Sequence, residues 1–278
     1  MALISGQVPN VIDTHYFIDT HCHFDFPPFS GAETASLMSA AQANVRQIIV
    51  PAVSANYFPR ILDLAAHYPP LFAALGLHPL YIAQHQEADL AALAAALADK
   101  TEKLVAVGEI GLDLYMDEPQ LPRQLAFLNA QLKLARQYDL PVILHSRRSH
   151  DQLAAALRKA ALPRAGVVHG FAGSLVQAQA FIRLGYYIGV GGTITYERAQ
   201  KTRNVMAELP LSALLLETDA PDMPLAGFQG QPNRPERAAN VFAALCELRQ
   251  EAPEEIATHL LHNSQRLFQL PPVDKSAR

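Results

Sequence analysis

The sequence predicts a (β/α)8 TIM barrel, and three observations support this fold class. Short apolar or β-branched runs alternate with Ala- and Leu-rich helical stretches along the chain. Eight such runs occur in 278 residues, a normal length for one α/β barrel. The first strand-to-helix turn, residues 19–24, reads Asp-Thr-His-Cys-His-Phe and carries no GxGxxG. This turn disfavours the other arrangement, an open doubly wound sheet.

Each predicted strand is a short run of apolar or β-branched residues between polar or turn-forming ones. In chain order the predicted strands are Phe17–Thr20, Arg46–Val50, Leu71–Leu75, Leu104–Val107, Pro141–Leu144, Gly166–Val168, Tyr186–Val190 and Ala213–Leu216. Their alternation with helices predicts a parallel sheet with the helices on its outer side.

The stretches between the strands carry apolar residues at helical spacing and are predicted as helices. They include Glu33–Ala43, Asp89–Ala98, Leu121–Tyr138, His150–Ala160, Leu175–Leu184, Arg198–Glu208, Glu236–Gln250 and a closing helix, Pro253–Leu267.

Composition favours one large folded domain. Half of the residues are hydrophobic and 17% are charged, which suits a large core and is untypical of disorder. No linker, charge block or low-complexity segment divides the chain. Residues 17–268 are therefore predicted to form a single barrel domain, with residues 1–16 as an N-terminal extension and residues 269–278 as a C-terminal tail.

Several protein classes are disfavoured by the sequence. No apolar run approaches the roughly 20 residues that a membrane span needs, and the N-terminus has no export signal. The two cysteines fit a reducing compartment, so a cytoplasmic location without a membrane or an obligate protein partner is expected. The net charge of −4 argues against a protein that wraps duplex nucleic acid, but allows a small site that grips one phosphate.

The strongest local signal is His21-Cys22-His23 after the first predicted strand. Side chains two apart on a strand point to the same face, so both imidazoles can grip one metal ion. Asp19 shares their parity and is a candidate to orient a ligand, whereas Cys22 has the opposite parity and is expected to pack. The alternative is two polar residues in a loop at a strand end.

Four further polar residues follow other predicted strands: Glu109, His145, His169 and Asp219. Each alone fits an ordinary structural role, as a helix cap, a solvated charge or a satisfied core histidine. A barrel, however, brings the carboxyl ends of all its strands to one rim, where barrel enzymes keep their active sites. Imidazoles and carboxylates together suit one or two divalent cations. The residues themselves thus indicate a divalent-metal hydrolase.

Two more residues are candidates for substrate binding. Arg147 lies two positions after His145 and is expected to face the same rim, where a guanidinium can bind a phosphate with two hydrogen bonds. A surface salt bridge explains it equally well. His78 ends Gly-Leu-His-Pro and fits either contact with a phosphate, protonation of a leaving oxygen, or a polar loop position.

Several strings resemble the TatD family of metal-dependent deoxyribonucleases, most closely its YjjV branch of hydrolases. They are Phe-Ile-Asp-Thr-His-Cys-His-Phe (17–24), Gly-Leu-His-Pro (76–79), Val-Gly-Glu-Ile-Gly-Leu-Asp (107–113), Leu-Pro-Val-Ile-Leu-His-Ser-Arg (140–147), His-Gly-Phe-Ala-Gly-Ser (169–174) and Leu-Glu-Thr-Asp-Ala-Pro (216–221). The resemblance covers residues 17–268, and in combination the strings are highly specific.

The resemblance implies a barrel of the metallo-dependent hydrolase type with a dinuclear metal site. The implied ligands are His21 and His23 for one ion, His145 and His169 for the second, Glu109 as the bridge and Asp219 as the residue that completes the site. Mixed nitrogen and oxygen ligation admits Zn²⁺, Mn²⁺, Mg²⁺ or Ni²⁺.

The expected activity is hydrolysis of phosphodiester bonds by a metal-activated water, with DNA or a nucleotide as substrate. Asp219 is the candidate general base, and Glu109 is expected to hold the metals in register. The resemblance further implies a 3′–5′ exodeoxyribonuclease on single-stranded DNA. An amidohydrolase or lactonase for a small metabolite is the alternative, since the sequence shows no aromatic–basic stripe for stacking bases. A non-enzymatic binding module is disfavoured by the intact set of candidate ligands.

Overall fold

The computed structural model describes residues 15–273, so most of the predicted N-terminal extension and the end of the C-terminal tail lie outside the described residues. Eight strands form one sheet in the order β1-β2-β3-β4-β5-β6-β7-β8. Each strand therefore lies beside its neighbours in the sequence, as successive βα units require.

The strands agree with the predicted ones in number and order. Their bounds are β1 Phe17–Asp19, β2 Val45–Pro51, β3 Leu71–Leu75, β4 Leu104–Asp113, β5 Val142–Arg147, β6 Gly166–Val168, β7 Tyr187–Val190 and β8 Leu214–Leu216.

The helices also follow the prediction, apart from one between β2 and β3 that was not among the predicted helices. Their bounds are α2 Glu33–Gln42, α3 Phe58–His67, α4 Glu87–Ala98, α5 Leu121–Gln137, α6 His150–Ala160, α7 Leu175–Arg183, α8 Gln200–Glu208, α9 Ala238–Leu248 and α10 Pro253–Phe268. The segment predicted as a single helix over Glu236–Gln250 begins as a 3₁₀ turn, Pro235–Arg237, before α9.

The chain divides into two compact units. Unit 1 comprises the residues up to Ile49 and those from Val190 onward, and unit 2 comprises Val50–Gly189. The boundaries fall inside strands β2 and β7. The single domain over residues 17–268 stays a prediction.

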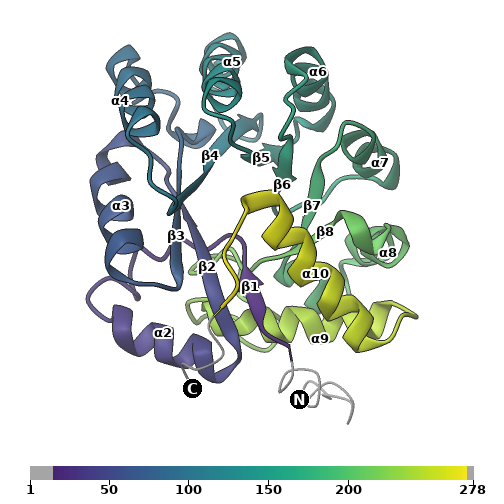
Figure 1. The fold of residues 1–278 in the computed structure, drawn as a ribbon. Coiled ribbons are helices and arrows are strands. Elements are labelled where there is room, and N and C mark those ends of the chain that lie inside the picture. The colour runs from purple at the N-terminus through teal and green to yellow at the C-terminus, as the bar shows by residue number, and fades with distance from the viewer. Residues whose placement is uncertain (1–14, 274–278) are drawn as a thin grey trace. The chain divides into compact units, whose positions relative to one another are not determined.

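Unit 2 contains strands β3–β6 and most of β7, with helices α3–α7 on their outer side (Figure 1). Helix α3 shows why these helices form, since Ile61, Leu64 and Ala65 recur at helical spacing and are all buried. The strands are buried along nearly their whole length, as expected for parallel strands covered by helices.

Unit 1 contains β1 and β8, which helices α9 and α10 hold in place. The ring of Phe17 on β1 lies 4.8 Å from the ring of Phe242 on α9. The buried Asn263 of α10 donates from Nδ2 to the carbonyls of Leu211 and Leu214, at 2.8 and 2.9 Å. These bonds satisfy backbone groups at the start of β8, so that α10 anchors the strand at that end.

Strands β4 and β5 are longer than predicted. They were expected to end at Val107 and Leu144, but β4 continues to Asp113 and β5 to Arg147. The extensions pair with each other in register, Gly111 with His145 and Asp113 with Arg147. The prediction ended each strand at the end of its uninterrupted apolar run, before Gly108 and before His145. The added positions include buried polar side chains, which continue a strand once partners satisfy them.

Gly111 permits this close pairing. Its φ is +145°, and a Cβ placed there would overlap the carbonyl oxygen of His145. Only glycine fits between the two extended strands at this point.

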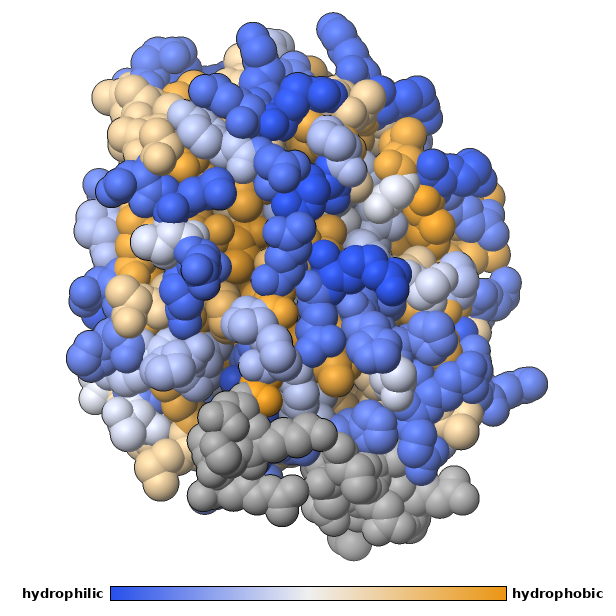
Figure 2. Space-filling model, viewed as in Figure 1, coloured by the Kyte–Doolittle hydropathy of each residue, from blue (hydrophilic) through white to orange (hydrophobic). Residues whose placement is uncertain are grey.

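The surface carries few large exposed hydrophobic side chains among the described residues. On the face shown in Figure 2, hydrophobic residues are scattered among hydrophilic ones. Three of the large exposed residues, Leu80, Tyr81 and Tyr115, belong to unit 2 and follow strands β3 and β4. Over residues 15–273, the helices are too short or too polar to cross a membrane.

We expect Gly111→Ala to destabilise the protein by more than about 4 kcal/mol, because the new Cβ overlaps backbone in addition to adopting an unfavourable φ. Gly31→Ala is the matched control, since Gly31 has a φ of +86° but no atom within 4 Å of the place where a Cβ would lie. It should lose only about 1–2 kcal/mol, from backbone strain alone. Urea denaturation of both variants measures the difference, and equal losses would contradict the steric argument.

Candidate metal centre

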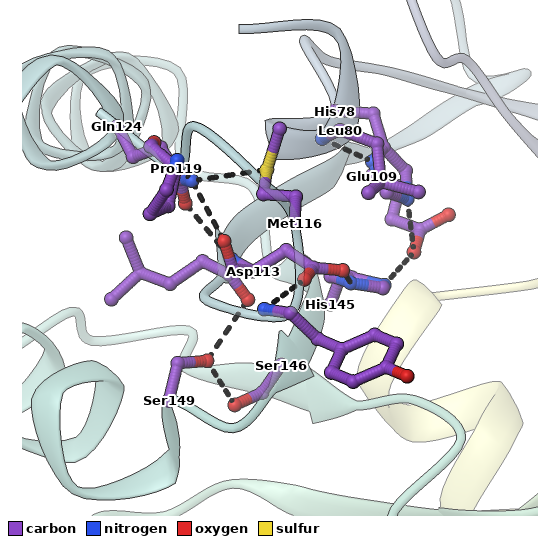
Figure 3. A network of polar contacts seen from close by, with 12 residues as sticks. His78, Leu80, Glu109, Asp113, Met116, Pro119, Gln124, His145, Ser146 and Ser149 are labelled. Carbon is purple, nitrogen blue, oxygen red and sulfur yellow. Dashed lines mark hydrogen bonds and ion pairs between the residues drawn. The ribbon is translucent and has the colours of Figure 1, made fainter. Parts of the chain in front are cut away.

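In unit 2, three imidazoles converge on one buried carboxylate. Oε2 of Glu109 lies 3.1 Å from Nε2 of His78, 3.2 Å from Nδ1 of His145 and 2.9 Å from Nε2 of His169. The Glu109 side chain is 1% exposed. The four residues come from strands β4 and β5 and from the residues that follow β3 and β6, so the carboxyl ends of these strands build the cluster. Figure 3 shows three of them, His78, Glu109 and His145.

The hydrogen bonds of His78 determine which of its nitrogens carries a proton. Its Nδ1 accepts a hydrogen bond from the backbone N–H of Leu80 at 3.1 Å. The neutral ring must then carry its proton on Nε2, the atom that faces Glu109. His78 is therefore a hydrogen-bond donor to Glu109, and its lone pair is turned away from the carboxylate. This geometry suits a donor to a negative group better than a metal ligand.

In His145 the proton lies on the nitrogen that faces away from Glu109. Its Nε2 lies 2.7 Å from Oδ2 of Asp113, and since a carboxylate only accepts, Nε2 carries the proton. In the neutral ring, the lone pair of Nδ1 then points toward Glu109. Burial lowers the pKa of His145. In the charged ring, however, both N–H groups donate, one to Asp113 and one to Glu109, and these hydrogen bonds raise the pKa overall. A carboxylate behind an imidazole in this way is typical of metal-ligating histidines.

Asp113, to which no role was assigned from the sequence, is completely buried at the end of β4. Its backbone N–H donates to Oε1 of Gln124, and Nε2 of Gln124 donates back to the carbonyl of Asp113, both at 2.8 Å. Its Oδ1 accepts from the N–H of Tyr115 at 2.8 Å. Asp113 lies four residues after Glu109 and so shares its parity on a strand, a signal that appears only once β4 extends this far.

A second cluster lies in unit 1. Nε2 of His21 and Nε2 of His23 each lie 3.5 Å from Oδ1 of Asp219. The two rings are 5.1 Å apart and nearly perpendicular. As expected from parity, Cys22 between them is fully buried.

Backbone hydrogen bonds place this second cluster. The N–H of Asp219 donates to the carbonyl of His21 at 2.8 Å, and the N–H of His23 donates to the carbonyl of Ala220 at 2.7 Å. The chain after β1 thus runs beside the chain after β8, and this pairing puts both imidazoles opposite the aspartate. Asp219 has a φ of +61°, a strained value that such bonds must maintain.

Asp19 supports the cluster through the backbone. Its Oδ1 accepts from the N–H of His21 and of Thr218, at 3.2 and 3.0 Å, and its Oδ2 lies 2.6 Å from the Thr218 hydroxyl. Burial raises the pKa of Asp19 to about 8, although these hydrogen bonds oppose the shift. Asp19 therefore orients the peptide that carries the candidate ligand His21.

The guanidinium of Arg147 lies at the surface. Arg147 is exposed, and its guanidinium carbon is 4.0 Å from the ring centre of Tyr115. Among residues 15–273 it makes no ion pair, so the structure does not bear out the salt-bridge explanation.

The residues present fit divalent metal ions. In His21–His23–Asp219 and in His78–Glu109–His145, one candidate atom from each residue lies within 4.8 Å of the others. The tautomers favour His145 over His78 as the ligand in the second group, and His169 offers a further nitrogen to Glu109. A mixture of imidazole nitrogens and carboxylate oxygens is typical of divalent transition-metal sites.

Comparisons of sequence agree with this chemistry. A family model of TatD-related DNases matches residues 18–269. The chain is 66% identical over 255 residues to YjjV of Escherichia coli K12, described as an uncharacterized metal-dependent hydrolase, covering 92% of this chain and 98% of that protein. It is 30% identical over 253 residues to YabD of Bacillus subtilis, covering 91% of this chain and 98% of that metal-dependent hydrolase.

Comparisons of structure confirm the predicted TIM-barrel fold class. The crystal structure of YjjV, a TatD homologue from E. coli, superposes with a TM-score of 0.91 at 65% identity, over 92% of this chain and 98% of that one. A TatD-family hydrolase from Entamoeba histolytica has the same fold, with a TM-score of 0.79 at 22% identity, over 91% of this chain and 98% of that one. With two His–carboxylate clusters and these relatives, the chain belongs to the TatD DNase family and is a metal-dependent hydrolase.

Proposed function

We propose that this hydrolase cleaves phosphodiester bonds and acts at the 3′ end of single-stranded DNA. The observation that carries the proposal is a buried cluster of imidazoles on Glu109, with the exposed guanidinium of Arg147 on the strand that carries His145. A group of candidate metal ligands next to a cationic side chain suits an anionic substrate. A neutral amide or lactone, the alternative substrate, would make no use of that charge.

We propose two bound divalent ions. His21, His23 and Asp219 would hold one ion, and His145 and His169 the other. Glu109 would bridge both, as the family resemblance implies. Two observations support the proposal. The candidate ligand atoms within each cluster lie close together, and Asp113 holds the proton of His145 on Nε2, which leaves the lone pair on Nδ1 for a metal ion. Zn²⁺, Mn²⁺, Mg²⁺ and Ni²⁺ all suit the donor set.

Divalent ions in such a site lower the pKa of a bound water and polarise a phosphoryl oxygen. The remaining chemistry belongs to side chains of this protein. The Asp219 side chain is 23% exposed and so accessible to solvent, which suits a general base that takes a proton from the attacking water. Glu109 is buried and held by three imidazoles, which suits a fixed ligand.

His78 and Arg147 would bind the substrate. Since Nδ1 of His78 already accepts a hydrogen bond from Leu80, its one available proton is on Nε2. In this structure that proton faces Oε2 of Glu109 at 3.1 Å. With divalent ions bound to Glu109, it would be donated to a phosphate oxygen or to the leaving oxygen instead. The guanidinium of Arg147 can bind a phosphate oxygen pair with two parallel hydrogen bonds.

The activity is tested by offering the protein labelled single-stranded DNA, bis-p-nitrophenyl phosphate and a panel of lactones and amides, each with Mg²⁺, Mn²⁺ or Zn²⁺. We expect cleavage of both phosphodiesters. Glu109→Gln should lower kcat/KM by more than about 100-fold. This loss exceeds the one expected when a residue that only hydrogen-bonds a metal ligand is replaced. Glu102→Gln, on an exposed residue, is the control and should retain activity. Cleavage of lactones or amides but of no phosphodiester would overturn the proposal.

The number of ions is tested by metal analysis of the purified protein. We expect two equivalents in the native protein and one in a His21→Ala/His23→Ala variant, because the His145 and His169 ligands remain. A single equivalent in the fully loaded native protein would contradict a dinuclear site.

Asp113→Asn should weaken metal binding about 10–100-fold. The single amide oxygen accepts from the N–H of Tyr115, so the NH2 group faces Nε2 of His145 and favours the proton on Nδ1. Competition with a chromogenic chelator measures the affinity. Asp117→Asn in the same loop is the control, since Asp117 is exposed. Unchanged affinity in Asp113→Asn would show that His145 does not ligate through Nδ1.

A further inference from the structure

Two arginines of unit 2 share one exposed aromatic ring. The guanidinium carbons of Arg147 and Arg148 lie 4.0 and 4.2 Å from the ring centre of Tyr115. Tyr115 is 47% exposed, and both arginines are exposed. This group does not stand out as a stripe in the sequence, because Tyr115 follows β4 whereas Arg147 ends β5 and Arg148 follows it.

The backbone of Arg148 brings the second guanidinium to the ring. On an extended strand consecutive side chains point to opposite faces, so an extended Arg148 would point away from Arg147. Its φ is +52°, however, in the left-handed region. This turn lets both consecutive side chains reach the same ring. A left-handed conformation is unfavourable for arginine, and such strain concentrates at functional sites.

The charge of this group is not neutralised within unit 2. Neither arginine has a carboxylate within ion-pair distance among residues 15–273. The acidic residues of the adjoining loop, Asp117 and Glu118, are exposed and pair with neither arginine. The face of an aromatic ring attracts a guanidinium but offers no hydrogen-bond acceptor in exchange. Two guanidiniums with unused donors suit a ligand that carries negative oxygens.

Hydrogen bonds connect this group to the side chains around Glu109. Asp113 accepts from the N–H of Tyr115 through Oδ1 and holds His145 through Oδ2. The N–H of Leu114 donates to the carbonyl of Arg147 at 2.9 Å. The same paired ends of β4 and β5 thus place the ligand His145 and the Tyr115–arginine group.

We propose that Tyr115, Arg147 and Arg148 form a subsite for the nucleotide next to the scissile bond of single-stranded DNA. The edges of the guanidiniums would bind its phosphate, and a guanidinium plane packed on the Tyr115 ring would stack on its base. Basic groups combined with an aromatic ring are the usual means of holding a single strand, whose bases are free to stack. This inference rests on the proposed function and specifies the substrate beyond the cleaved phosphate.

The test is binding of a fluorescein-labelled, phosphorothioate-linked dT8 strand to the purified native protein, followed by fluorescence anisotropy. Arg148→Gly is the decisive variant, because glycine accepts a φ of +52° and the variant should fold at least as well as the native protein. We expect the Kd to rise about 10-fold. The slope of log Kd against log salt concentration should fall by about 0.7, the value for one lost phosphate contact. Tyr115→Leu should raise the Kd about 10-fold and leave the slope of log Kd against log salt concentration unchanged.

Arg158→Ala is the matched control, since Arg158 is an exposed arginine on α6 away from the ring. It should bind as the native protein does. A Kd within two-fold of the native value for Arg148→Gly would overturn the subsite, and an unaltered Kd for Tyr115→Leu would overturn the stacking contact.

Kinetics separate this inference from the proposed function. The ratio of kcat/KM for dT8 with ordinary linkages to kcat/KM for bis-p-nitrophenyl phosphate should fall about 10-fold in Arg148→Gly. If the native protein cleaves both substrates and this ratio does not change, the subsite is wrong and the proposed function stands. If the native protein cleaves neither, the proposed function fails, and the substrate assignment of the subsite fails with it.

Discussion

A carboxylate buried among strands must meet a cation or enough proton donors, and Glu109 shows how this requirement shapes unit 2. Three imidazoles surround one of its oxygens. Each imidazole needs its own second partner, and for His145 that partner is Asp113. Glu109, His145 and Asp113 thus have partners among themselves, and such partners allow β4 and β5 to continue past their uninterrupted apolar runs.

The same requirement separates the roles of residues that look alike. His78 and His145 both contact Glu109, but the N–H of Leu80 and the carboxylate of Asp113 place their protons on different sides. One ring then offers a proton toward Glu109, and the other can offer a lone pair. The distinction between a donor and a ligand thus follows from the partner on the far side of each ring.

Much of the fold and of the candidate site could be predicted from local patterns. The strands are short apolar runs, and the candidate ligands follow them directly, so that His21, Glu109 and His169 stand out in the sequence. Asp113 was missed because the predicted strand ended with its uninterrupted apolar run at Val107. Tyr115 and Arg148 were missed as a pair because one lies after β4 and the other after β5.

The amino-acid sequence by itself determined the order of strands and helices and the family, and it supplied the candidate metal ligands, since all of these depend on neighbours in the chain. Only the tertiary structure decided which nitrogen of each histidine faces Glu109, that Asp113 supports His145, and that Arg148 shares a ring with Arg147. The physical reason is that a hydrogen bond or a ring contact depends on the positions of two separate strands. The register of β4 on β5 sets those positions. The polar residues of one strand do not specify this register without the other strand.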